Sequence, residues 1–349
     1  MINLTTLLEK EPVRASAPCR VDAGGTWDIK ALSLPMERIQ PATINMGLTL
    51  RTSAVLKPSP GNTVRISSRG FSQSEIFSAD QMPFNPPFGI FFAAISYFGF
   101  SGLEVEIDSE APVKSALGGS STALVALIKA LSKVRAKLGQ KSLSRKQILY
   151  LAYHVEDGVS GGNCGLQDQA AAVYGGVNQW IWRHGDSSGL FRKTLLLDKE
   201  GQEQLSKRIL VVYSGKSHVS ATTNRKWVHD FLAGQTRAGW IKANEIVHRF
   251  AGALKERHWN EAASHLKEEM ALRREITPEA MTPLTDRLVM EAEKLGCGSR
   301  FAGAGAGGSV WALGEVVAIE KLRQAWGIAL DSMEGGRILD CRIDGAGAM

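Results

Sequence analysis

An α+β fold with two domains is predicted from three observations on this chain. The chain has 349 residues, and a domain usually holds about 100–200 residues. Short runs in which apolar and polar residues alternate are typical of strands, and they occur in both halves. Segments with helical periodicity separate these runs. We place the boundary where residues 198–207 are polar, which predicts domains of residues 1–200 and 201–349.

The first half is expected to hold strands followed by helices. Residues 103–107 alternate between apolar and acidic side chains, so one face of this strand is apolar and the other faces water. A turn rich in Gly and Ser leads from this strand into a helix over residues 123–138. Ser144 is expected to cap a second helix that runs to about Asp157. Further strands are expected over residues 48–56 and 64–67.

The second half is expected to mix helices and strands. Between residues 236 and 295 the pattern is helical for three segments. Thr277 and Pro278 mark one helix start, with Thr as the cap and Pro at the first helical position. Strands are expected over residues 208–213, 310–313 and 338–343.

Composition and charge exclude several classes of protein. The formal net charge of +6 is spread along the chain, which suits an anionic ligand better than nucleic acid. The four cysteines are far apart, so neither a disulfide framework nor a zinc site is expected. The N-terminus lacks a signal-peptide pattern, and the longest apolar-rich run, residues 89–100, is too short to cross a bilayer. We therefore expect a cytoplasmic protein with no nucleic-acid or membrane partner.

The segment after the strand at 103–107 has the composition of a phosphate-binding turn. It reads Pro112-Val-Lys-Ser-Ala-Leu-Gly-Gly-Ser-Ser-Thr-Ala123. Glycines let backbone N–H groups approach a phosphate, and the helix that follows has a partial positive charge at its N-terminus. Serine hydroxyls can bind phosphate or Mg²⁺. An ordinary strand-to-helix turn with a serine cap is the alternative, and no Walker A pattern is present.

Two carboxylates flank a second glycine-rich turn. Glu156 ends an amphipathic helical pattern, and Asp168 follows twelve residues later at the start of an Ala-rich helix. Such carboxylates can converge on one pocket, where Asp168 at a helix N-terminus would stay ionised. A proton acceptor, an electrostatic anchor or a simple capping acid all fit this position, and the residues alone favour the cap.

The phosphate-binding turn resembles the second motif of the GHMP kinases, the family of galactokinase, homoserine kinase, mevalonate kinase and phosphomevalonate kinase. That motif is Pro-x-x-x-Gly-Leu-Gly-Ser-Ser-Ala, and here Ala116 replaces a glycine and Gly119 replaces the first serine. By position Ser120 matches the metal-binding serine of the family, and Ser121 stands in if the loop is shifted by one residue. The resemblance implies that ATP is bound by Ser115, Leu117, Gly118, Gly119, Ser120, Ser121 and Thr122.

Residues 17–28 resemble the first motif of the same family, in the form found in kinases of fucose and of heptose 7-phosphate. Arg20 falls on the arginine near the catalytic aspartate, where a cation would lower the pKa of a carboxylate and stabilise a transferring phosphoryl group. Asp28 falls on an aspartate that binds sugar hydroxyls, with helix capping as the alternative. Gly25 and Thr26 are assigned to the substrate with it, while the alignment of residues 22–27 is left open.

Gly165-Leu-Gln-Asp-Gln169, with Ala-Ala and Gly-Gly after it, resembles the family segment that carries the catalytic aspartate. Asp168 takes that place, and Gln167 beside it is assigned to the substrate. Glu156 falls where the family has its Mg²⁺-binding glutamate. Phosphoryl transfer needs mostly positioning and charge neutralisation, so these residues account for much of the machinery.

Gly303-Ala-Gly-Ala-Gly-Gly308 resembles the third GHMP motif, a glycine loop that lies near the phosphate loop, and Gly305 is assigned to the substrate. The same residues match G-x-G-x-x-G, but an apolar strand pattern follows where a dinucleotide site needs a helix. His218 stands where heptose kinases have an arginine, so a phosphate on the substrate is left open.

The resemblance implies an N-terminal domain like ribosomal S5 domain 2 and a C-terminal ferredoxin-like domain. It implies a kinase that uses ATP and Mg²⁺ to phosphorylate a sugar or sugar phosphate, with the anomeric hydroxyl as acceptor, for example D-glycero-D-manno-heptose 7-phosphate or a related hexose. A non-catalytic ATP or sugar sensor and a mevalonate- or homoserine-type enzyme are the alternatives. Assembly as a homodimer is left open.

Overall fold

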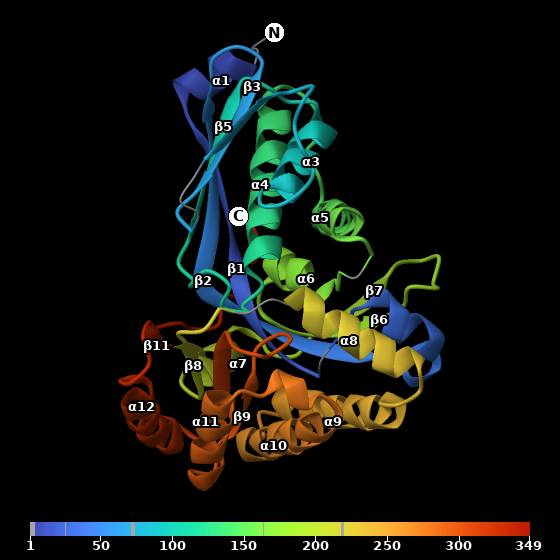
Figure 1. The fold of residues 1–349 in the computed structure, drawn as a ribbon, viewed down its shortest axis with the longest axis vertical. Helices are drawn as coiled ribbons and strands as arrows, with labels where there is room; N and C mark the ends of the chain where they lie inside the picture. Colours follow the sequence, from blue (N-terminus) through green and yellow to red (C-terminus); the bar gives the residue numbers. More distant parts are fainter. Residues whose placement is uncertain (1–3, 25, 71–73, 163, 218–219) are drawn as a thin grey trace.

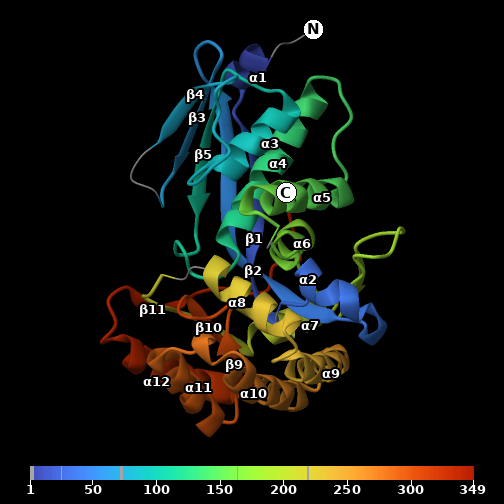
Figure 2. The same ribbon diagram turned by 45° about the vertical axis from the view of Figure 1, so that its right-hand side comes forward.

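The computed structural model describes residues 4–24, 26–70, 74–162, 164–217 and 220–349. Within them, the first half forms a seven-stranded sheet and the second half a four-stranded antiparallel sheet. Figures 1 and 2 show the first sheet with its helices above the second sheet with its helices. The predicted α+β fold is confirmed, while the domain boundary at residue 200 stays a prediction.

The first sheet is organised around the long strand β2 (Ala42–Pro58). β1 (Val13–Ala23) pairs antiparallel with β2 along its whole length, and β5 and β6 pair with other parts of β2. The strand order is β4-β3-β5-β2-β6-β7, with β1 beside β2. The remaining strands are β3 (Thr63–Ser68), β4 (Glu75–Ser78), β5 (Leu103–Ser109), β6 (Val177–Trp182) and β7 (Phe191–Leu195).

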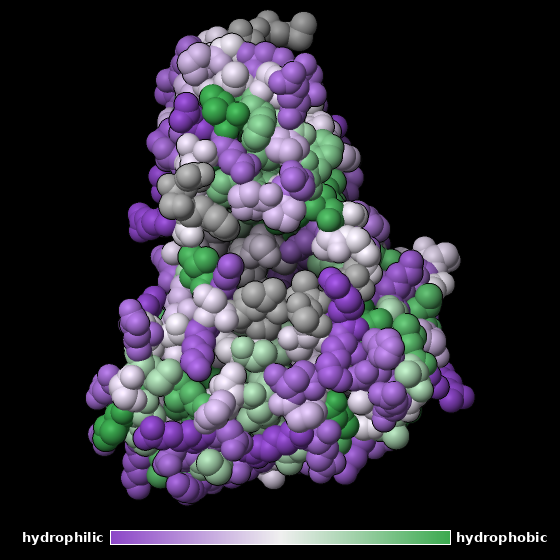
Figure 3. All heavy atoms as spheres, in the orientation of Figure 1, coloured by the Kyte–Doolittle hydropathy of each residue, from purple (hydrophilic) through white to green (hydrophobic). Residues whose placement is uncertain are grey.

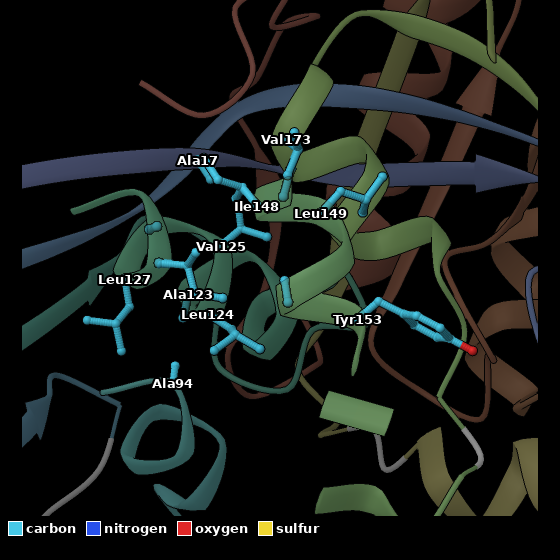
Figure 4. Packing of buried hydrophobic residues seen from close by; sticks show 14 of the residues in the cluster. Ala17, Ala94, Ala123, Leu124, Val125, Leu127, Ile148, Leu149, Tyr153 and Val173 are labelled. Carbon is cyan, nitrogen blue, oxygen red and sulfur yellow. The ribbon is translucent and has the colours of Figure 1, made fainter. Parts of the chain in front are cut away.

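Helices cover one face of this sheet, and α4 (Gly119–Lys137) packs directly on it (Figures 1 and 2). Its Ala and Leu residues are strong helix formers, and Leu124, Leu127 and Leu131 recur at helical spacing and are fully buried. Burial of each such side chain is worth about 1.5–3 kcal/mol. Figure 4 shows α4 side chains packed among residues of the neighbouring helices and of β1. The turn at the N-terminus of α4 is therefore held by a rigid element.

The other helices of the first half surround α4 or follow the sheet. The Ser144 cap is confirmed, because its side chain accepts from the backbone of Gln147 and the Gln147 side chain accepts from the backbone of Ser144. The helices are α1 (Leu4–Lys10), α2 (Lys30–Ser33), the 3₁₀ helix η1 (Leu34–Ile39), α3 (Gly89–Phe98), α5 (Arg145–Ser160), α6 (Gln167–Tyr174) and α7 (Lys199–Ser206).

The second sheet has the order β11-β8-β10-β9, which in chain order is fourth, first, third and second. With several helices between β8 and β9 and one helix between β10 and β11, this is the ferredoxin-like arrangement. Its strands are β8 (Ile209–Ser214), β9 (Gly298–Phe301), β10 (Ser309–Leu313) and β11 (Gly336–Leu339). Its helices are α8 (Ser220–Leu232), α9 (Arg237–Lys255), α10 (Trp259–Ile276), η2 (Pro278–Ala280), α11 (Pro283–Lys294) and α12 (Val316–Leu330).

The strand β8 is buried on both faces, which explains its continuous apolar sequence. Ile209, Val211 and Tyr213 belong to the core that contains α9 and α10. The alternate residues Leu210 and Val212 belong to the core formed with α11 and α12. Among the described residues, no helix combines the length and the apolar character needed to cross a bilayer.

In the second half two predicted boundaries were wrong, and in the first half α4 begins four residues and β2 six residues earlier than predicted. An α-helix does not begin at Thr277, because its hydroxyl is engaged with Arg273 at the end of α10 and only the short η2 follows. The α-helix begins five residues later at Pro283, capped by Thr282. The last strand ends at Leu339, because the chain then leaves the second sheet and Ile343 pairs with the first sheet.

Candidate active site

The centre of the site is an ion pair between Arg20 on β1 and Asp168 in the first turn of α6. Arg20 Nε and Nη2 both lie 2.7 Å from Asp168 Oδ1. The Asp168 side chain is 25% exposed and that of Arg20 only 4%, so the carboxylate opens to solvent. Desolvation raises the pKa of Asp168 above its ordinary value, and the Arg20 charge opposes that rise. None of the described residues donates a hydrogen bond to the second oxygen, Oδ2.

The phosphate loop, residues 115–122, lies against this carboxylate. Gly118 has a φ of 78°, and a Cβ there would lie 3.2 Å from both Cγ and Oδ2 of Asp168, so a larger residue would be strained and would crowd the carboxylate. The Ala116 carbonyl accepts a hydrogen bond from Arg20 Nη1 at 2.6 Å. The loop, Arg20 and Asp168 therefore form one unit.

The part of the phosphate loop that is exposed to solvent is the part that forms the first turn of α4. Gly119 and Ser120 are exposed at the N-terminus of α4, where the first N–H groups of a helix lack intrahelical partners. Thr122 Oγ1 already donates to the Gly118 carbonyl at 2.8 Å. Three further residues assigned to ATP are buried, namely Ser115, Leu117 and Ser121. The surface is hollowed at the level of α6 (Figure 3).

The residues predicted to bind Mg²⁺ lie side by side. Ser120 Oγ donates to Glu156 Oε1 at 3.2 Å, and Gln169 Nε2 donates to Glu156 Oε2 at 2.6 Å. Desolvation raises the pKa of Glu156 to about 7, against hydrogen bonds that include one with Ser121. A hydroxyl and a carboxylate are oxygen donors that suit Mg²⁺, which usually takes its other ligands from water and phosphate. In the described part of the chain no group of three His, Cys, Asp or Glu side chains is placed to hold a metal ion, so water and nucleotide oxygens would complete this site.

Three residues predicted to bind substrate form a buried polar wall beside Asp168. Asp28 Oδ2 accepts the backbone N–H of Gln167, the first residue of α6, at 3.0 Å, whereas the N-cap of the helix that follows Asp28 in the chain, α2, is Ile29. Its other oxygen, the Thr26 hydroxyl and Gln167 Oε1 are buried and have no hydrogen-bond partner among the described residues. Desolvation raises the pKa of Asp28 to about 7. Buried polar atoms of this kind are usually satisfied by water or a ligand.

The third glycine loop, residues 303–308, lies where the resemblance implies. A Cβ on Gly308 would lie 2.8 Å from the Ser115 carbonyl oxygen, so this end fits against the phosphate loop. Gly305 packs on Ala280 and Phe301, and a Cβ there would lie 2.6 Å from the Ala280 carbonyl oxygen. Gly25 and His218 lie outside the described residues.

Sequence reasoning missed two charged residues behind the site. Asp22 accepts from the Gly303 backbone N–H at 2.7 Å and from Arg300 Nη1 at 2.6 Å, and both side chains are fully buried. The signal available for Asp22 was its position two residues after Arg20, which puts both on the same face of a strand. For Arg300 the only available signal was its position three residues before the glycine loop.

Residues 89–176 match the family of GHMP kinases N terminal domain, which spans β5, the phosphate loop and Asp168. A bifunctional fucokinase/GDP-fucose pyrophosphorylase from Arabidopsis thaliana is 24% identical over 315 residues, which are 84% of this chain and 29% of that protein. This chain therefore spans less than a third of the length of that relative.

Solved structures share the fold over nearly the whole chain. Galactokinase from Lactococcus lactis, complexed with galactose, has a TM-score of 0.77 at 18% identity and covers 99% of both chains. Phosphomevalonate kinase from Streptococcus pneumoniae, in complex with phosphomevalonate and AMPPNP, has a TM-score of 0.74 at 14% identity and covers 96% of this chain and 100% of the other. Similar scores for such different ligands show that the fold alone does not select the substrate.

Proposed function

We propose that this chain, which belongs to the GHMP kinase superfamily, is an ATP-dependent kinase that phosphorylates a sugar hydroxyl. One observation carries the proposal. The Asp168 carboxylate is partly exposed, paired with Arg20, and lies against Gly118 of the phosphate loop. A group able to hold an acceptor hydroxyl therefore borders the place where a transferable phosphate would bind.

The roles follow from this geometry. Asp168 Oδ2 would accept the hydrogen bond of the acceptor hydroxyl and take its proton as the oxygen attacks the γ-phosphorus and the bond to ADP breaks. Arg20 holds Oδ1 and balances charge near the transferring group. Ser120 and Glu156 would hold Mg²⁺, which supplies charge neutralisation on the phosphates when bound.

A sugar suits the buried polar wall of Thr26, Asp28 and Gln167. The unpartnered oxygens of these side chains are acceptors, so they call for a ligand rich in hydroxyl donors. The match to a fucokinase-containing relative supports the same substrate class. The anomeric hydroxyl is the acceptor we expect, on a heptose or hexose with or without a phosphate elsewhere.

A screen of ADP release over free sugars, sugar phosphates, mevalonate and homoserine tests this function. We expect turnover that requires both ATP and Mg²⁺ and is fastest with a sugar. Faster turnover of mevalonate or homoserine would place the protein among those kinases. ATP binding without turnover of any acceptor would favour the sensor.

A further inference from the structure

A line of alternating charges leads from Asp168 into the buried interior of the second half. Arg20 Nη1 lies 3.6 Å from Asp22 Oδ1, on the side opposite its contact with Asp168. Arg300 Nη1 lies 2.6 Å from Asp22 Oδ2, and Arg300 Nε lies 3.2 Å from Glu269 Oε2 on α10. Asp22 is thus held between one guanidinium of the first half and one of the second.

Asp22 collects its hydrogen bonds from the second half of the chain. Its carboxylate accepts from Arg300 on β9 and from the backbone of Gly303, and its carbonyl accepts from Trp311 Nε1 on β10 at 3.1 Å. At the far end of the glycine loop, a Cβ on Gly308 would lie 2.7 Å from the Ala116 Cβ. One end of the loop is therefore hydrogen-bonded to the strand that carries Arg20, and the other end packs against the phosphate loop.

The ion pair of Asp22 and Arg300 fixes the positions of its neighbours more than it adds to the free energy of unfolding. Removing a carboxylate and a guanidinium from water costs several kcal/mol per ion, and the attraction between them offsets little more than that. Desolvation would raise the pKa of Asp22, but Arg300 and Arg20 together hold that pKa below its ordinary value, so Asp22 is charged. A buried pair of ions with directional hydrogen bonds fixes position where an apolar contact would allow sliding.

We propose that Asp22 and Arg300 are positioning residues that set the place of Arg20 between Asp168 and the phosphate loop. This rests on the kinase function proposed above. Arg20 touches Asp168 with two nitrogens and the Ala116 carbonyl with the third, so a shift of its guanidinium moves the catalytic carboxylate relative to the phosphates. Phosphoryl transfer then requires the glycine loop of the second half to be docked on Asp22.

The test compares R300M, R300K and the charge-balanced double variant D22N/R300M with the wild type. A misplacement of about 1 Å costs about a hundredfold in rate, so we expect kcat of R300M to fall about 10- to 100-fold with KM for ATP within about threefold. R300K should recover most of that loss, because it keeps the cation. If R300M does not fold, R300K and the double variant carry the test, and a folded double variant with wild-type kcat overturns the proposal.

Arg51 supplies a matched control. It pairs with Asp344 at 16% and 9% side-chain exposure and joins β2 to the last residues of the chain. R51M removes a comparable ion pair, so it should lower the melting temperature and leave kcat unchanged. A loss of kcat in R51M as large as that in R300M would show that any buried ion pair has this effect, and the positioning role would fall.

Hydrogen exchange separates this proposal from the kinase function. Without nucleotide or sugar, D22N should speed amide exchange in residues 301–309, because the Gly303 N–H loses its charged acceptor, whereas R51M should not. If the wild type phosphorylates no acceptor, the kinase proposal fails. The exchange rates would still show whether Asp22 holds the glycine loop of the second half in place. An exchange rate in residues 301–309 of D22N that equals that of the wild type overturns the positioning role of Asp22.

Discussion

The phosphate loop and the charge cluster, Arg20, Asp22, Asp28 and Asp168, lie in contact but are built on different principles. The loop relies on backbone conformation, with left-handed residues at Ala116 and Gly118 and an exposed helix start after them. The cluster relies on titratable groups that are partly or wholly removed from water, and its Arg20 is paired with Asp22 and with Asp168. Substitutions should therefore act on the cluster through charge and on the loop through shape, with the larger effects in the cluster.

The largest effect is expected for Asp28→Asn measured as a function of pH. Burial raises the pKa of Asp28 from 3.8 to about 7, so between these values the unfolded chain releases a proton that the folded chain keeps. Wild-type stability therefore falls as pH rises from about 4 to 7, by up to about 4 kcal/mol. An asparagine can still accept the hydrogen bond from Gln167 without burying a charge. In denaturant titrations, the unfolding free energy of the variant should therefore rise relative to that of the wild type as pH increases across this range.

Asp186→Asn is the control for that prediction, because Asp186 has its pKa lowered by hydrogen bonds from Ser188 and lies in a loop. Because its pKa lies below 3.8 in the folded protein, the difference in stability between Asp186→Asn and the wild type should stay nearly constant from pH 5 to 8. A difference in stability between Asp28→Asn and the wild type that stays constant from pH 5 to 8 would contradict the raised pKa of Asp28.

Asp168→Asn should separate turnover from nucleotide binding. The substitution keeps the size of the side chain but removes the proton acceptor, so kcat should fall about a hundredfold or more while MgATP affinity stays within a few fold. Asp331→Asn, on the exposed end of α12, should match the wild type in both measurements. Equal turnover in Asp168→Asn would remove the role assigned to the carboxylate.

Gly118→Ala tests the contact between loop and cluster. The methyl group would meet Asp168 at 3.2 Å and force an alanine to a φ of 78°, which costs about 1–2 kcal/mol. We expect that loss in unfolding free energy and a fall in kcat of about tenfold. Gly119→Ala is the stability control, because its Cβ would meet no atom within 4 Å, and unfolding free energy should stay within about 0.5 kcal/mol.

More of the phosphate loop than of the charge cluster could be predicted from the sequence. Its residues are contiguous, and the glycine-rich turn before an apolar helix is a local signal. Arg20, Glu156 and Asp168 were found through short motifs and are indeed close to the loop, with Ser120 touching Glu156. Asp22 and Arg300 are 278 residues apart in sequence and meet through two different sheets. No local pattern distinguishes such a pair from ordinary surface charges.

Helix boundaries show the same limit. Thr277-Pro278 and Thr282-Pro283 carry the same local signal for a helix start, and only the second pair begins an α-helix. The choice depends on whether the threonine hydroxyl is free, and that of Thr277 bonds to Arg273. Arg273 itself is fixed by stacking on Trp227 and Trp240, a tertiary arrangement that the spacing of residues does not reveal.

The smallest expected effect is a gain in stability from Ala116→Gly. Ala116 has a φ of 63°, and glycine adopts this conformation without the steric penalty of about 1–2 kcal/mol that a Cβ brings. Greater freedom of glycine in the unfolded chain offsets part of this, so we expect a net gain of about 0.5–1 kcal/mol in unfolding free energy. The same substitution at Ala136, exposed within α4, should lose about 1 kcal/mol. Losses of equal size at both positions would mean that the loop is not held by its left-handed backbone, and the contrast between loop and cluster would disappear.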